Sequence, residues 1–301
     1  MSEQHILVIG AAGQLGKCLT DKLRAQKIPH TLLDRQQADI NDTVVLEKII
    51  IEATEQNKVT ALINAAAYTN VDKAETEPML AQRVNVDGPT ALAKLCSRFD
   101  IPLIHVSTDY VFNGEGKSPY TETDTPSPIG IYGKTKLDGE IAVQRHCQKY
   151  IILRTAWVFS EYGNNFVKTM LRLASEHSSL NIVSDQFGCP TYAGDIAASI
   201  ITILKKLHSG SSDNTGYGLY HYAGNKSVSW YEFALTIFAE AQQRGLIESA
   251  PHINAITTSD YPTAAKRPAN SALNTTKIFD QFQIPPCNWQ QALDVVLKKL
   301  N

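Results

Sequence analysis

Tyr132 and Lys136 stand four residues apart in the run Tyr-Gly-Lys-Thr-Lys, which places both side chains on one face of a helix. A phenol has a reference pKa of about 10, too high for ready proton exchange near neutral pH. A neighbouring ammonium favours the phenolate and lowers that pKa. Thr108, in the run Ser-Thr-Asp-Tyr, offers a hydroxyl to hold a carbonyl oxygen beside the phenol. These three residues predict acid–base chemistry at a carbonyl group.

A glycine-rich run near the start of the chain gives the Tyr–Lys pair a context. Gly10, Gly13 and Gly16 follow the strand-like run 5–9 directly and open the helical pattern 14–26. Gly10 allows a tight turn, Gly13 lets backbone approach a pyrophosphate, and Gly16 lets helix and strand pack together. The helix N-terminus adds free N–H groups and a partial positive charge. The sequence therefore predicts a dinucleotide site.

Residues near the next two strand ends fit the rest of a dinucleotide. Asp34 ends the predicted second strand, where a carboxylate would hydrogen-bond the ribose 2′-OH of NAD. Arg35 would instead meet the 2′-phosphate of NADP, so both cofactors stay open. Further candidate cofactor contacts lie at the helix start, after the second strand and after the third strand: Gln14, Leu15, Asp39, Ile40, Ala65, Ala66, Ala67, Tyr68 and Thr69.

Short strands alternate with longer helices along the first half of the chain. Nearly all-apolar strands separated by helices indicate a parallel sheet covered on both faces, which is a doubly wound α/β fold of the Rossmann type. Thr108 follows the fourth strand, at the sheet edge where such folds bind ligands. The predicted strands are 5–9, 31–34, 61–64, 103–107 and 151–155, and the predicted helices are 14–26, 42–56, 80–98 and 133–148.

The alternation breaks beyond Trp157, where Gly-, Asn-, Pro- and Ser-rich segments interrupt shorter elements. We predict a dinucleotide-binding domain over residues 1–157, partly completed by segments within 192–220. Residues 158–301 would form mainly a smaller, C-terminal substrate-binding lobe, with the substrate in the cleft between the two parts. Helices are predicted in this half at 166–176, 193–207, 230–244 and 289–300.

Composition limits the classes of function. Apolar residues make up 43% and charged residues 19%, which fits a well-buried globular protein. The net charge of -2 gives no sign of a nucleic-acid partner, and no apolar run is long enough to predict a membrane span. The sequence start lacks a signal-peptide layout, and the five cysteines include no C-x-x-C pair. We therefore expect a cytoplasmic protein with reduced cysteines.

Six blocks of the sequence resemble one family. With the glycine turn and the Tyr–Lys pair, they make the chain similar, over nearly its whole length, to the dTDP-4-dehydrorhamnose reductases of the extended short-chain dehydrogenase/reductase superfamily. The last three blocks lie outside the general dinucleotide-binding pattern, which makes the resemblance specific. The blocks are Asn64–Thr69, Val71–Glu75, Ser107–Phe112, Arg154–Val158, Asp185–Gly188 and Arg267–Ser271.

The resemblance implies a reduction. Hydride would pass from NADPH or NADH to C4 of a 4-keto-6-deoxy sugar attached to dTDP, converting dTDP-4-dehydro-L-rhamnose to dTDP-L-rhamnose. Tyr132 would give a proton to the forming alkoxide, and Lys136 would bind the nicotinamide ribose and tune Tyr132. Thr108 takes the place that serine holds in many relatives.

The resemblance also implies a substrate-binding site. Asp109, Tyr110 and Trp157 would line the sugar, with Trp157 giving the hexose a flat apolar face. Arg267 would anchor the diphosphate, because its fork matches phosphate oxygens. Ala272 stands where a basic residue is common in the family, which leaves the details of nucleotide contact open.

One departure from the family concerns assembly. Some members form homodimers around magnesium held by acidic residues, one of them two positions after the third glycine. Cys18 stands at that position, and a thiol is a poor ligand for Mg²⁺, which prefers hard oxygen donors. We therefore expect no metal site of this kind, while a homodimer of another kind stays open.

Two other functions stay open. A related branch serves as a non-catalytic regulatory subunit of methionine adenosyltransferase, which binds a dinucleotide and acts through its partner. The presence of Thr108, Tyr132 and Lys136 together favours an enzyme. The other alternative is a different nucleotide-sugar epimerase, dehydratase or reductase. A dehydratase would want an acid/base pair beside Thr108, and Asp109-Tyr110 offers an acid without an adjacent glutamate.

Overall fold

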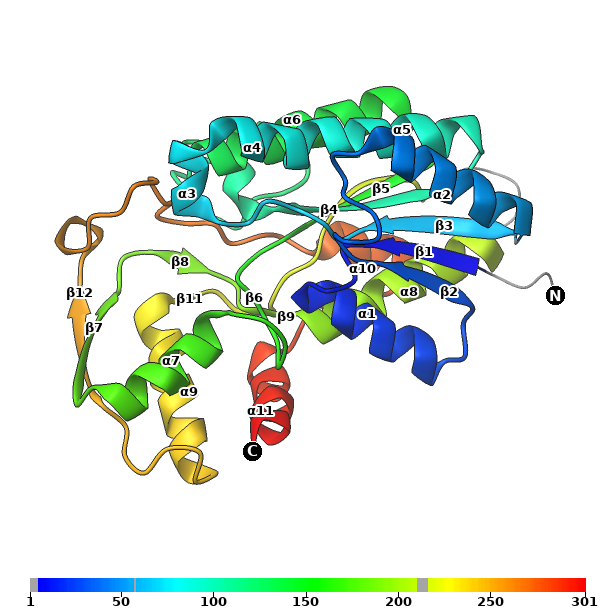
Figure 1. Cartoon of the computed structure of the whole chain (residues 1–301). Coiled ribbons are helices and arrows are strands. Elements are labelled where there is room, and N and C mark those ends of the chain that lie inside the picture. Colours follow the sequence, from blue (N-terminus) through cyan, green and yellow to red (C-terminus); the bar gives the residue numbers. More distant parts are fainter. Residues whose placement is uncertain (1–4, 57, 210–215) are drawn as a thin grey trace.

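A six-stranded parallel sheet forms the centre of the protein (Figure 1). The computed structural model describes residues 5–56, 58–209 and 216–301. The strand order is β10-β5-β4-β3-β1-β2, so the chain runs from β1 to β2 at one edge and then from β3 through β4 and β5 to β10 at the other. The strands are β1 His5–Ile9, β2 His30–Leu33, β3 Val59–Asn64, β4 Leu103–Thr108, β5 Tyr150–Thr155 and β10 Gly218–His221.

Helices cover both faces of this sheet (Figure 1). Along β1, Ile6 and Val8 belong to one buried cluster, and Leu7 and Ile9 belong to another. Alternate side chains of a strand point to opposite faces, so the sheet is buried on both sides, as the all-apolar strands predict. The covering helices are α2 Thr43–Gln56, α4 Pro78–Gln82, α5 Gly88–Arg98 and α6 Ile131–His146 above the sheet, and α1 Gln14–Ala25 and α8 Ala193–Ser209 below it.

The helix predicted at 80–98 differs from the structure in its middle. It begins earlier, at Pro78 in α4, and passes through a π-helical turn at Arg83–Asp87 before α5. Pro89 lies in the first turn of α5. A proline ring clashes with the carbonyl four residues earlier in a regular α-helix, and the wider π turn avoids that clash. A short helix that the sequence analysis missed, α3 Val71–Thr76, precedes this run.

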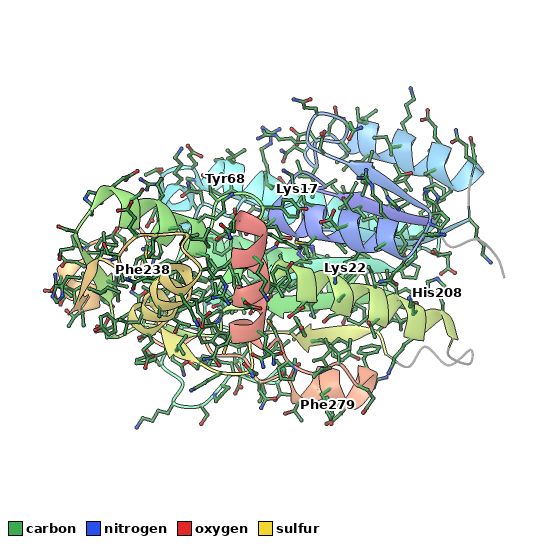
Figure 2. All side chains as sticks on the ribbon, turned by 90° about the horizontal axis from the view of Figure 1, so that it is seen from below. Lys17, Lys22, Tyr68, His208, Phe238 and Phe279 are labelled. Atoms are coloured by element: carbon green, nitrogen blue, oxygen red, sulfur yellow. The ribbon has the colours of Figure 1, made fainter. Side chains whose placement is uncertain are left out.

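The second half of the chain divides between the central sheet and a smaller lobe. The strand β10 pairs with β5, and α8 packs against α1. Figure 2 shows α11 between the α1/α8 side and the lobe that contains α9. α10 Thr276–Phe282 also packs on the sheet side, against β10 and α8. The lobe elements are β6 Val158–Phe159, α7 Phe166–Glu176, β7 Ser179–Val183, β8 Phe187–Gly188, β9 Thr191–Tyr192, β11 Val228–Ser229, α9 Trp230–Gln243, β12 His252–Ile256 and α11 Trp289–Leu300.

The predicted division of the chain at residue 157 stays a prediction. Its sheet-completing segment, 192–220, includes residues 210–215, which lie outside the described part of the chain. Among the residues that the structure describes, no helix is both long and apolar enough to cross a membrane.

Candidate active site

A cleft of about 680 Å³ opens along the carboxyl ends of the central strands. It brings together most of the residues that the sequence analysis singled out. Gly16, Asp34 and Arg267 do not line it. The predicted residues that do line it are Gly10, Gly13, Gln14, Leu15, Arg35, Asp39, Ile40, Ala65, Ala66, Ala67, Tyr68, Thr69, Thr108, Asp109, Tyr110, Tyr132, Lys136 and Trp157.

Two of the three glycines in the turn are required by the packing of the fold, and the third is not. A Cβ on Gly10, which has a φ of +85°, would lie 2.6 Å from the Ala66 nitrogen, and one on Gly16 would lie 2.3 Å from the Gly10 oxygen. A Cβ on Gly13 would meet only the Gly10 oxygen, at an ordinary 3.4 Å. The fold itself therefore needs Gly10 and Gly16, whereas it leaves open space beside Gly13, the N-cap of α1. That space fits an anionic group on the free N–H groups of the helix.

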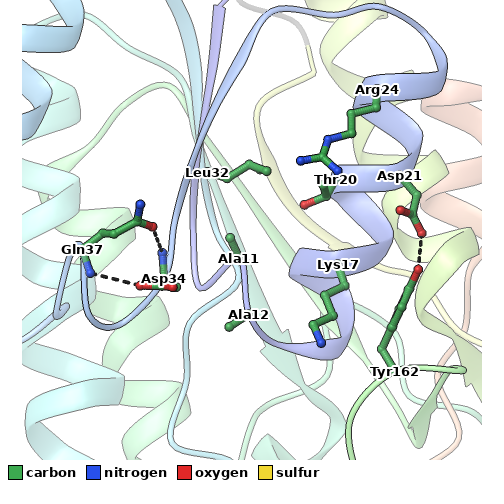
Figure 3. Close-up of a pocket in the computed structure, with 10 residues that line it drawn as sticks. All are labelled: Ala11, Ala12, Lys17, Thr20, Asp21, Arg24, Leu32, Asp34, Gln37 and Tyr162. Atoms are coloured by element: carbon green, nitrogen blue, oxygen red, sulfur yellow. Dashed lines mark hydrogen bonds between the residues drawn. The ribbon is translucent and has the colours of Figure 1, made fainter.

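The side of the cleft near β2 carries exposed charges. Asp34 follows β2 and lines a neighbouring hollow of about 500 Å³, where its Oδ1 accepts from the backbone N–H of Gln37 (Figure 3). The same oxygen also accepts from the backbone N–H of Gln36. Arg35 lies 3.5 Å from Asp39, with side-chain exposures of 78% and 37%. Each of the two residues that favour opposite cofactors thus has a local partner already.

The catalytic candidates meet at the ends of β4 and α6. Thr108 is the last residue of β4, and Tyr132 and Lys136 lie one turn apart at the start of α6. The Lys136 Nζ donates to the Val106 carbonyl oxygen at 2.8 Å, and the side chain is 2% exposed. The Tyr110 and Tyr132 rings meet edge to face, with centroids 5.5 Å apart.

Burial changes the proton affinities of these groups. It raises the pKa of Tyr132 to about 12, and the Thr108 hydroxyl acts in the opposite direction. It lowers the pKa of Lys136 to about 8, against the raising effect of Glu140. The phenol therefore holds its proton at neutral pH, and the lysine is charged below about pH 8.

A buried ion pair next to Lys136 was not singled out from the sequence. Glu140, one turn after Lys136, receives a bidentate hydrogen bond from Arg154 of β5, with a shortest distance of 2.7 Å. The two side chains are 1% and 3% exposed. The four-residue spacing places Glu140 on the same helix face as Lys136 and could have drawn attention to it. Nothing in the sequence, however, pairs Glu140 with Arg154. Tying the middle of α6 to β5 helps to hold Lys136 in place.

Two of the expected sugar-site residues have partners within the protein. Trp157 stacks on Trp230, at the start of α9, with centroids 3.4 Å apart and planes 2° apart, so one face of its ring is covered. Arg267 does not reach the cleft lining and instead pairs with Asp72 of α3 at 2.6 Å. Trp230 also lines the cleft, and no sequence motif marked it.

The position of Cys18 bears on metal binding. The residue is 3% exposed, and burial raises the pKa of its thiol to about 12. It therefore stays a protonated thiol, which is a poor ligand for any metal. Over the described ranges, no group of three or more His, Cys, Asp or Glu side chains is arranged to hold a metal ion.

Comparisons with known proteins find one family over nearly the whole sequence. The family described as the RmlD substrate binding domain matches residues 4–301. A dTDP-4-dehydrorhamnose reductase of Aggregatibacter actinomycetemcomitans is 48% identical over 293 residues, covering 96% of this chain and 97% of the relative. The crystal structure of a Clostridium acetobutylicum dTDP-4-dehydrorhamnose reductase has a TM-score of 0.89 at 35% identity, covering 98% and 99% of the two chains.

A further similar structure was solved with a bound cofactor. The Bacillus anthracis dTDP-4-dehydrorhamnose reductase, in complex with NADP, has a TM-score of 0.88 at 33% identity, covering 99% of this chain and 100% of that chain. The family match spans nearly the whole sequence, and the fold predicted from the sequence is confirmed. The chain belongs to the dTDP-4-dehydrorhamnose reductase family.

Proposed function

We propose that this protein reduces the C4 keto group of dTDP-4-dehydro-L-rhamnose to give dTDP-L-rhamnose, with NADPH or NADH as cofactor and Tyr132 as proton donor. Family membership over residues 4–301 and the names of the relatives support the reaction. The observation that carries the proposal is the convergence of Thr108, Tyr132 and Lys136 in the cleft that also contains the open glycine turn.

The cofactor would lie along the carboxyl edge of the sheet. The N–H groups in the first turn of α1, at Gln14 and Leu15, would hold its diphosphate, because the Gly13 N–H already donates to the Gly10 oxygen. Asp39 and Ile40 would face the adenosine, and the Ala65–Thr69 segment, which also lines the cleft, would lie close to the cofactor. When bound, the nicotinamide supplies the hydride. Lys136 would hold the nicotinamide ribose through its ammonium group.

Residues of the protein would donate the proton and stabilise the charge that it leaves behind. Tyr132 keeps its phenolic proton at neutral pH, because burial raises its pKa to about 12. As the C4 oxygen gains negative charge, that proton moves from the Tyr132 oxygen to the sugar oxygen. The Lys136 ammonium then stabilises the phenolate that is left, which makes the transfer favourable inside a buried site.

The substrate would approach from the second half of the chain. Asn164, Phe166 and Trp230 reach the cleft from beyond residue 157, which supports residues 158–301 as the main substrate lobe. Asp109, Tyr110 and Trp157 would line the sugar. Arg267 would contact the diphosphate only after leaving Asp72, its ion-pair partner.

The test is an assay of NADPH and NADH oxidation with dTDP-4-dehydro-L-rhamnose generated in situ by its upstream enzymes. We expect dTDP-L-rhamnose to accumulate in step with cofactor oxidation, identified by NMR of the sugar. Tight dinucleotide binding without any reduction would contradict the proposal and favour a binding subunit. The same preparation analysed by light scattering would decide whether the protein is a homodimer.

A further inference from the structure

Asp109 places a buried carboxyl group directly beside the Thr108 hydroxyl. The residue is 2% exposed and begins the 3₁₀ turn Asp109–Val111 that follows β4. Its Oδ1 accepts a hydrogen bond from Thr108 Oγ1 at 3.0 Å. Its Oδ2 is buried and forms no direct hydrogen bond in the described part of the chain, although the Ser271 hydroxyl lies near enough to lower the pKa of the carboxyl. A carboxylate is less stable in such a place than in water, so burial shifts the equilibrium of Asp109 toward the acid form.

The Thr108 hydroxyl has only one proton to give. It accepts from the Tyr110 backbone N–H at 3.2 Å and donates to Asp109. A hydroxyl has one donor and two acceptor positions, so Thr108 has no proton left for a ketone oxygen while Asp109 is a carboxylate. If Asp109 is protonated, its O–H donates to the Thr108 oxygen. The Thr108 proton is then free to turn toward the cleft.

We propose that Asp109 is a positioning residue whose protonation state sets the direction in which Thr108 donates its hydrogen bond, with the acid form as the productive one. The inference rests on the proposed ketone reduction. In the productive state, the chain of donors runs from Asp109 to Thr108 to the C4 oxygen, beside the phenol of Tyr132. Asp109 transfers no proton to the product and need not touch the sugar.

The groups that face Asp109 from the packed elements are weak acids and hydroxyls. They are Tyr110 on its own turn, Tyr132 on α6, Cys189 between β8 and β9, and Ser271 in the C-terminal segment. Burial raises the pKa values of Tyr110, Tyr132 and Cys189, so these three stay neutral near pH 7.

Burial also raises the pKa of Asp109 itself to about 6, against the lowering effects of the Ser271 and Thr108 hydroxyls. The charged Arg267 acts on the adjacent Tyr110, and its own charge is matched by Asp72. The change in the hydrogen bond that Thr108 donates is therefore expected near pH 6, where activity can be assayed.

The experiment is the pH profile of kcat from about pH 5 to 9, with saturating NADPH and sugar, for the wild-type protein and Asp109→Asn. In the wild type, kcat should fall by up to about tenfold as pH rises through about 6, the effect of losing one hydrogen bond to the substrate. An asparagine amide donates to Thr108 at every pH, so the Asp109→Asn profile should lack this step. A second decline near pH 8, from Lys136, should remain in both proteins.

A control and the contrary outcomes make the test decisive. Thr108→Ser keeps the hydroxyl and should keep the step, whereas Thr108→Val should lower kcat and lack it. A step near pH 6 that persists in Asp109→Asn or Thr108→Val, or is absent from the wild type, would overturn the inference. So would a loss above about 100-fold in Asp109→Asn with NADPH binding retained. A wild-type protein that reduces no sugar would overturn the proposed function itself, which is a different result.

Discussion

The two ends of the cleft handle charge in opposite ways. At the β2 end, Arg35 and Asp39 form an ion pair that is largely exposed to water. At the α6 end, Lys136 is 2% exposed, and the Glu140–Arg154 pair behind it is almost fully buried. Water screens exposed charges, whereas a buried charge interacts strongly with its neighbours and shifts their pKa values. We therefore expect the β2 end to bind the cofactor mainly through backbone groups, and the α6 end to carry the proton chemistry.

The largest loss of activity is expected from a change at the α6 end of the cleft. Tyr132→Phe keeps the ring and its contact with Tyr110 but removes the acid, so kcat should fall by about 10²–10⁴-fold. NADPH affinity, measured by fluorescence titration, should change little. Tyr261→Phe removes a hydroxyl from an exposed tyrosine and serves as the matched control. Reduction at close to the wild-type rate by Tyr132→Phe would refute its role as proton donor.

Breaking the buried ion pair should be the next largest effect. Arg154→Met leaves Glu140 without its partner at 1% exposure, so the free energy of unfolding should drop by about 3–5 kcal/mol. Arg172→Met breaks the exposed pair with Glu176, one turn away on α7, and should change stability by at most about 0.5 kcal/mol. Urea denaturation of both variants measures the difference. Equal losses would mean that burial does not separate the two kinds of pair.

Substitutions at two glycines of the turn should have different effects, one on cofactor binding and the other on stability. Gly13→Val extends a side chain into the open space at the start of α1, so NADPH should bind roughly 10–100-fold more weakly, as expected for a clash of about 1–3 kcal/mol. Gly16→Val clashes with the Gly10 backbone and should reduce the melting temperature sharply. Calorimetric titration and thermal melting check the two expectations. Unchanged NADPH affinity in folded Gly13→Val would place the diphosphate elsewhere.

The smallest effect should be the choice between NADPH and NADH. Arg35 and Asp34 favour opposite cofactors, and each already has local partners. We expect kcat/KM for the two cofactors to differ by less than about a hundredfold, since one hydrogen bond to a charged group contributes roughly 1.5–3 kcal/mol. Arg35→Gln should move the ratio toward NADH. A far larger preference in the wild type would show that one of these two residues dominates.

The sequence alone determined those features that depend on neighbours along the chain. The period of the apolar residues predicted the parallel sheet and the helices of its two faces, because local contacts and burial on each face impose that period. The glycine spacing located the turn after β1, and the four-residue spacing placed Tyr132 and Lys136 on one face of α6. The six sequence blocks that resemble the dTDP-4-dehydrorhamnose reductases identified the family.

Only the tertiary structure decided which partners the side chains choose across long stretches of chain. Arg267 pairs with Asp72, Arg154 with Glu140, and Trp157 stacks on Trp230. No local pattern encodes such pairs, because they form only when the packing of the sheet, α6 and the lobe brings distant residues together. The direction of the Thr108 hydroxyl follows from the same packing, since the charge state of its neighbour Asp109 depends on how deeply the surrounding elements bury it.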